Sequence, residues 1–267
     1  MVTITKDQIK SKPVAWLDGS TPDGGVMPGT PIYAVQCGQF LDPLNKSLQS
    51  AKRIDLGVDG KLVFLIEDLL THDEANKIIE ITESLGYRPE APGIVTAPGL
   101  RKNKSVHWLA ENKIMKVFFN RLSPVLPQEI DGRPLASCLS ARINMYRYDK
   151  GDVFNPHIDG DWPGFDLSDD GESMIEIPCV RSKLSLVLYL NGISDGVEGG
   201  ETVIYDKGRV VKIVPPKKGS ALVFRHGHTH DTVLHAGAPV LGEIPKYVAR
   251  INILYDENEN FLVSDYS

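Results

Sequence analysis

The second half of the chain repeats one pattern: short segments of alternating apolar and polar residues, separated by turn residues. A period of two is typical of strands with one buried face, and several such segments in succession indicate a β sandwich or barrel. The predicted strands are residues 136–148, 183–191, 201–206, 209–215, 219–226 and 246–256.

Two amphipathic helices are predicted before these strands, over about 71–86 and 111–123. Thr71 can cap the first helix, and Glu74 three residues later completes a capping box. Helices followed by a run of strands predict a mainly β fold with flanking helices, of the α+β class, in which the helices lie outside an antiparallel sandwich or barrel.

Three other stretches lack a clear period. Residues 1–60 are rich in Gly, Pro and Asp and predict loops with a few short strands. Residues 91–108 and the acidic residues 161–179 predict long loops. We expect residues 1–60 to be an N-terminal extension packed on the core, and residues 61–267 to form the main domain.

Polar residues follow one face of two predicted strands. They are Arg142, Asn144, Tyr146 and Tyr148 in one strand, and Lys246, Arg250 and Asn252 beside Val248 in the other. A half-exposed sheet explains this alternation. The alternative is a barrel with polar faces inside, which would need a polar ligand because unpaired buried polar groups are costly.

Metal-binding side chains cluster in two segments. His157 and Asp159 in NPHIDGD lie two residues apart, so on an extended chain they reach a common point, although a surface turn can also contain this pair. The segment FRHGHTHDTVLH adds His226, His228, His230 and His235. Two histidines and one carboxylate on one face of a metal are typical of non-haem Fe(II) oxygenases. The dispersed Cys37, Cys138 and Cys179 do not suit a closed zinc site or a disulfide framework.

From about Val63 to Tyr255 the sequence resembles the prolyl 4-hydroxylase-like branch of the 2-oxoglutarate/Fe(II)-dependent dioxygenases. Four pieces carry the resemblance in the family's order: YRYDKGDVFNPHIDG, LSLVLYLN with VEGGETVIY, VPPKKGSALVFRH, and HAGAPV with KYVARINILY. The resemblance implies a double-stranded β-helix, a jelly roll, as the core over about 137–256.

The same resemblance implies that His157, Asp159 and His235 bind Fe(II). His235 is preferred over His230 because the following Gly-x-Pro-Val matches the family.

For 2-oxoglutarate, the resemblance implies that Lys246 meets the distal carboxylate, with Arg250 on the same strand face as the fallback. Tyr148, Tyr189 and Thr202 match other positions of the cosubstrate pocket. Buried tyrosines also serve as core residues with a hydrogen-bonded hydroxyl, so that role stays open for Tyr189.

The implied enzyme uses O2 and 2-oxoglutarate to hydroxylate an unactivated C–H bond, releases succinate and CO2, and takes ascorbate as a reductant. Asp159 favours hydroxylation over halogenation, because the family's radical halogenases have a small residue there. The leading substrate is a prolyl residue of a protein or peptide. The alternatives are a free amino acid or other small molecule, and a non-catalytic jelly-roll binding protein that retains a metal.

Charged residues are expected at the mouth of the site. The acidic segment 161–179 could act as a lid for a cationic substrate, or it could be a solvated loop. Across the mouth, Arg101, Lys102, Asn103 and Lys104 would oppose a purely cationic ligand.

The overall charge excludes some partners. The net charge is −6 with no Lys/Arg tract, so nucleic acid is not an expected partner. No signal-peptide or membrane-spanning run is seen, and the cysteines fit a reducing compartment, which favours a cytoplasmic protein. The oligomeric state cannot be inferred from these patterns.

Overall fold

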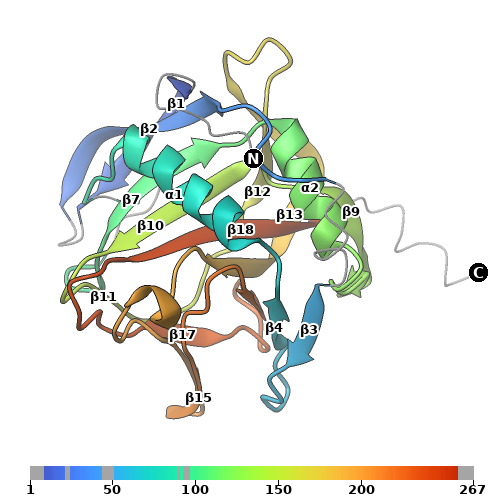
Figure 1. Cartoon of the computed structure of the whole chain (residues 1–267). Helices are drawn as coiled ribbons and strands as arrows, with labels where there is room; N and C mark the ends of the chain where they lie inside the picture. The colour runs from blue at the N-terminus through green and yellow to red at the C-terminus, as the bar shows by residue number, and fades with distance from the viewer. Residues whose placement is uncertain (1–8, 22–24, 44–50, 90, 93–96, 258–267) are drawn as a thin grey trace, which may run out of the picture.

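Two β-sheets and two helices account for most of the computed structural model, which describes residues 9–21, 25–43, 51–89, 91–92 and 97–257 (Figure 1). The major sheet runs in the order β3 (Lys52–Asp55), β4 (Val63–Glu67), β16 (Ala221–Arg225), β13 (Met174–Tyr189), β18 (Lys246–Asp256), β10 (Arg142–Tyr148), β7 (Lys104–Leu109), β2 (Val26–Gln36), β1 (Lys10–Ser20) and β5 (Ala91–Pro92). The strands β12 (Pro163–Leu167), β9 (Arg133–Leu139) and β8 (Glu129–Ile130) branch from it. The minor sheet runs β15 (Arg209–Val214), β14 (Thr202–Asp206), β17 (Leu234–Gly237), β11 (Val153–His157) and β6 (Arg101–Lys102).

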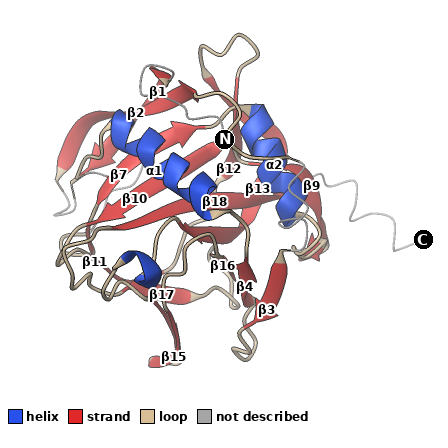
Figure 2. Cartoon of the chain, in the orientation of Figure 1, coloured by secondary structure: helices blue, strands red, loops and turns tan. Residues whose placement is uncertain are grey.

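The helices α1 (His72–Leu85) and α2 (Asn112–Leu122) lie together in front of the major sheet (Figure 2). The capping box predicted at Thr71 and Glu74 is present at the start of α1. One hydrophobic cluster joins the helices to the major sheet and includes Ile78, Phe118 and Met145 of β10. A second cluster joins the two sheets and includes Tyr148, Val248 and Ile204 of β14. The predicted mainly β, jelly-roll architecture with outer helices is therefore confirmed.

The polar strand faces point into the protein, and the alternative of a half-exposed sheet is wrong. The exposed fractions of Arg142, Lys246, Arg250 and Asn252 are 7%, 2%, 8% and 7%. In β10 the opposite face, with Ile143 and Met145, packs in the cluster that holds the helices. One face of the major sheet thus builds the core, and the other supplies polar groups to the space between the sheets.

Two stretches predicted as loops contain strands, and in residues 1–60 the strands are longer than the few short ones predicted, so these predictions are corrected. In residues 91–108, β7 lies between β10 and β2, with apolar Val106 on one face and polar His107 on the other. In residues 161–179, β12 pairs with the start of β13, and Phe165 packs on the core. In residues 1–60, β1 and β2 are long strands that contain several prolines and glycines, such as Pro13 and Pro31.

The sheet extends through β2 and β1, since β2 pairs with β7 in parallel. The assignment of residues 1–60 to a separate extension stays a prediction. Among the described residues, no helix is long and apolar enough to cross a membrane.

Candidate active site

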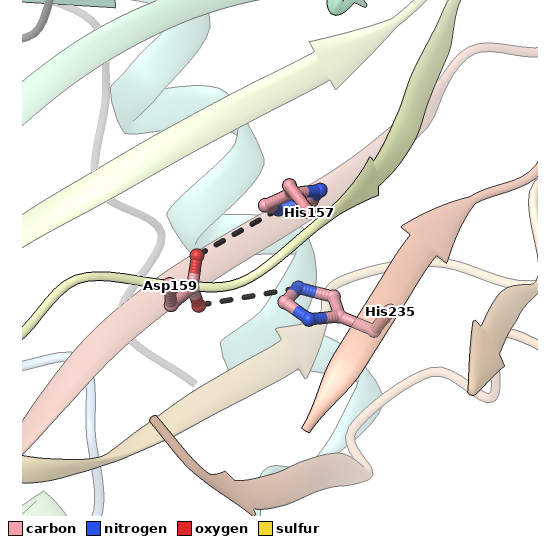
Figure 3. A group of neighbouring side chains, drawn as sticks. All are labelled: His157, Asp159 and His235. Carbon is pink, nitrogen blue, oxygen red and sulfur yellow. Dashed lines mark ion pairs between the residues drawn. The ribbon is translucent and has the colours of Figure 1, made fainter. Parts of the chain in front are cut away.

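Three potential metal ligands converge between the sheets (Figure 3). His157 ends β11, and its register partner in the antiparallel strand β17 is His235. Asp159 follows two residues after His157, so the carboxylate turns toward both rings. The ligand atoms of the three side chains all lie within 4.8 Å of one another, and no other such group of three occurs in the described part of the chain. His230 is not a member of this group.

Both histidines present the same ring nitrogen to the shared point. The Nδ1–H of His157 donates to the Asn155 carbonyl at 2.8 Å, and that of His235 donates to the Val233 carbonyl at 3.2 Å. A carbonyl can only accept, so Nδ1 carries the proton and Nε2 keeps its lone pair. Burial lowers the pKa of His157 to about 3 and also lowers that of His235. Neutral rings with free Nε2 atoms are the form that binds a metal.

Asp159 is held by its Oδ2 atom. Ser185 donates to Oδ2 at 2.6 Å, and Arg250 Nε lies 3.1 Å from it. Burial by itself would raise the pKa of Asp159, but the charge of Arg250 lowers it, the Ser185 hydrogen bond acts in the same direction, and the pKa is lowered overall. The other oxygen, Oδ1, lies 3.7 Å from His157 Nε2. The carboxylate is therefore ionised and has one oxygen available for a metal, which fits a facial triad.

A chain of hydrogen bonds continues behind Ser185. His226 Nδ1 lies 2.8 Å from Ser185 Oγ, and His226 Nε2 lies 3.0 Å from Ser182 Oγ. Because the Ser185 hydroxyl donates to Asp159, its oxygen accepts from His226 Nδ1–H, which fixes the tautomer of His226. The sequence interpretation did not assign these residues, although a serine inside the apolar run KLSLVLYLN is a signal that could have identified Ser185.

The triad opens onto a cavity of about 170 Å³ between the sheets. Its wall includes Tyr148, Val187, Thr202, Lys246 and Val248.

Lys246 is the innermost cation of this wall that contacts no carboxylate in the described structure. Its Nζ donates to the Gly200 carbonyl at 2.7 Å and lies 4.4 Å from the centroid of the Tyr148 ring. Burial lowers the pKa of Lys246 to about 8, since a low-dielectric site disfavours the charged ammonium. A carboxylate ligand beside Nζ would restore that charge.

The other residues predicted around the cosubstrate divide into two groups. Tyr148 and Thr202 line the cavity. Tyr189 lies behind this wall, where its hydroxyl is 2.8 Å from Thr202 Oγ1, so it orients Thr202. Arg250 also lines the cavity, but its contacts are with Asp159 and Ser185.

The acidic segment 161–179, for which the sequence allowed a lid or a solvated loop, contributes no residue to this wall. Asp161 pairs with Arg181, and the cavity wall includes residues up to Gly160 of this region.

Comparison with known proteins agrees with this geometry. The model of the 2OG-Fe(II) oxygenase superfamily matches residues 143–254. No curated protein sequence matches the chain.

Among solved structures, the chain is similar to the viral collagen prolyl hydroxylase of Paramecium bursaria Chlorella virus-1 in its 2OG complex. The identity is 21%, the match covers 74% of this chain and 98% of that one, and the TM-score is 0.50. A prolyl-4-hydroxylase of Pseudomonas putida matches at 14% identity over 73% of this chain and 92% of its own, with a TM-score of 0.46. The viral likeness supports the jelly-roll fold. The family model and the converging His157, Asp159 and His235 together identify residues 143–254 as a domain of the 2OG-Fe(II) oxygenase superfamily.

Proposed function

We propose that this oxygenase hydroxylates a prolyl residue in a protein or peptide. The observation that carries the chemistry is that the triad and Lys246 line one small cavity. The prolyl substrate is supported by the shared fold with the viral collagen prolyl hydroxylase.

In this proposal His157, Asp159 and His235 hold Fe(II), and Lys246 pairs with the distal carboxylate of 2-oxoglutarate. The hydroxyl groups of Tyr148 and Thr202 donate hydrogen bonds to the cosubstrate, with Tyr189 orienting Thr202. Arg250 forms an ion pair with Asp159, with its Nε 3.1 Å from Asp159 Oδ2. It is therefore not the main anchor of the cosubstrate.

The bound iron supplies O2 activation coupled to decarboxylation of 2-oxoglutarate. One oxygen atom of O2 enters the substrate C–H bond, and the other enters succinate as CO2 leaves. The protein's part is to fix the ligands and exclude water. Ile158, Val187 and Val248 give the cavity apolar walls, which protect reactive species from side reactions.

The test is a screen of proline-containing peptides with Fe(II), 2-oxoglutarate, ascorbate and air. A substrate should stimulate succinate release and gain one oxygen atom at proline by tandem mass spectrometry. Peptides with proline replaced by alanine are the control. Oxygen gain at another residue, or equal gain in the alanine peptides, would contradict the prolyl assignment.

A second candidate is the same reaction on a free amino acid or other small molecule. The volume of the cavity supports it, since about 170 Å³ is smaller than the roughly 300–1,000 Å³ of usual ligand sites. Such a cavity has room for the cosubstrate and only a small reacting group. Small molecules therefore belong in the same screen.

A further inference from the structure

The wall of the active-site cavity carries an excess of positive charge. Its cations are Arg101, Lys246 and Arg250, and its single carboxylate is Asp159. Arg250 pairs with Asp159. In the proposed function, Lys246 pairs with the distal carboxylate of 2-oxoglutarate. Adding a ferrous ion and a 2-oxoglutarate dianion leaves this excess of positive charge unchanged, and Arg101 is the cation of the wall to which no anion is assigned.

Arg101 is buried, with 7% of its surface exposed. Its Nε donates to Asn103 Oδ1 at 2.9 Å, which satisfies one of its donors. Its Nη2 has no hydrogen-bond partner among the described residues. A buried guanidinium with an unused donor is costly unless a ligand supplies an acceptor.

Arg101 lines the same cavity as the proposed metal ligands. Its guanidinium lies 4.8 Å from the centroid of the Phe154 ring and 5.0 Å from that of Tyr146. Phe154 in turn stacks on His157 with 3.5 Å between ring centroids. One aromatic ring therefore separates Arg101 from a proposed iron ligand.

The layer behind this wall offers no anion either. Nδ1 of His107 on β7 is hydrogen-bonded to Oδ1 of Asn144 on β10. Burial lowers the pKa of His107 to about 3, so the ring is neutral. His107 Nε2, Arg142 Nε and Asn252 Oδ1 are also without hydrogen-bond partners in the described structure. Among the residues that the structure describes in this wall and in the layer behind it, none supplies a counter-ion for Arg101.

We propose that the substrate carries a carboxylate and that Arg101 binds it beside the carbon that is hydroxylated. This inference rests on the proposed function, since it concerns the substrate of the same site. It explains the unused Nη2 donor, because a planar guanidinium pairs with a carboxylate through parallel N–H donors. The carboxylate belongs either to a free acid or to a peptide, through its C-terminus or an acidic side chain.

The test uses acetate as the probe and Mn(II) as an inert paramagnetic substitute for iron. With Mn(II) and saturating 2-oxoglutarate bound, relaxation of the acetate methyl protons reports acetate held near the metal. We expect saturable relaxation with acetate and none with acetamide. Arg101→Gln should weaken acetate binding about tenfold or more, because a hydrogen bond to a charged group contributes roughly 1.5–3 kcal/mol.

Two variants control this comparison. Lys102→Gln removes the same charge from the exposed neighbour in β6 and should bind acetate as the wild type does. Arg101→Lys keeps the charge and should retain part of the affinity. Mn(II) affinity measured in each variant verifies that the site is folded.

Each result has a definite meaning. Acetate that does not bind, binds no better than acetamide, or is unaffected by Arg101→Gln overturns the inference. Failure to bind Mn(II) or 2-oxoglutarate instead contradicts the proposed function, so the two failures are distinguishable. Succinate release with free acids compared with peptides carrying carboxylates then identifies the source of the carboxylate.

Discussion

At the scale of single residues, the orientation of Asp159 depends on groups that do not touch the metal position. Ser185 and Arg250 occupy Oδ2, which leaves Oδ1 facing His157. Partners of this kind orient metal ligands, and their loss typically costs 10- to 100-fold in metal affinity.

Ser185→Ala is therefore predicted to weaken Mn(II) binding by roughly 10- to 100-fold. Titration of the protein with Mn(II) measures this. Ser182→Ala is the matched control, because Ser182 bonds to His226 and to the backbone of Trp162 but not to Asp159. Equal loss of affinity in both variants would show that Ser185 acts only through general packing.

The low pKa of Lys246 predicts a pH dependence for 2-oxoglutarate. Only the ammonium form pairs with the distal carboxylate, and the pKa of about 8 means that this form is lost as the pH rises through 8. Affinity of the Mn(II) protein for 2-oxoglutarate should be constant below that pH and fall by up to about tenfold per pH unit above it.

A 2-oxoglutarate titration between about pH 7 and about pH 9 checks this dependence. Lys246→Met should bind weakly at every pH, while Lys212→Met, at an exposed position of β15, should behave as the wild type. An affinity that is independent of pH in the wild type would refute Lys246 as the anchor.

Sequence order alone allowed His157, Asp159 and His235 to be grouped, because family-like segments surround each of them. It could not separate Lys246 from Arg250, since both lie on one face of the same strand. The choice depends on neighbours across strands: Ser185 of β13 lies beside Asn252 of β18, which brings its hydroxyl to Arg250 and Asp159. For the same reason the hydrogen bonds of His226 could not be predicted.

At the scale of elements, a buried ion pair joins the two helices. Arg121 of α2 donates to both carboxylate oxygens of Glu74 in α1, at 2.7 and 3.0 Å. Arg121 also donates to the carbonyls of Leu69 and Asp42, so it connects both helices to the preceding segments. Glu74 completes the capping box by accepting from the Thr71 backbone at 2.9 Å.

Arg121→Met is predicted to destabilise the protein by about 3–5 kcal/mol, because it leaves the carboxylate of Glu74 buried without its cation. Urea unfolding measures this change. The control, Lys116→Met, alters an exposed residue of the same helix and should change the free energy of unfolding by less than about 0.5 kcal/mol. If Arg121→Met lowers the free energy of unfolding by less than about 1 kcal/mol, the ion pair does not stabilise the packing of the two helices as predicted.

The elements that could be predicted are those with one apolar face, such as β10, β18 and both helices. The strand β7 was missed because its inner face is polar, and its neighbouring Gly/Pro cluster is typical of a loop. The full length of β1 and β2 was not predicted, because proline and glycine interrupt their pattern and their pairing has irregular registers.

At the scale of the whole molecule, the two faces of the major sheet have different roles, one in packing and the other in the active site. Its outer face holds the helices through an apolar cluster, and its inner face lines the cavity with the minor sheet. Residues from β10, β11, β14, β17 and β18 must meet for the site to exist, so the site depends on closure of both sheets. A family-like order of segments predicts that closure, while the charge of the cavity wall becomes apparent only in three dimensions.

The most direct test of the central claim is succinate release from 2-oxoglutarate with Fe(II) and ascorbate in air. The wild type and Lys212→Ala should release succinate, Asp159→Ala should release none, and Lys246→Ala should need far more 2-oxoglutarate. An unchanged rate in Asp159→Ala would contradict the account. So would a wild type that binds Fe(II) and 2-oxoglutarate yet releases no succinate with any peptide or acid offered.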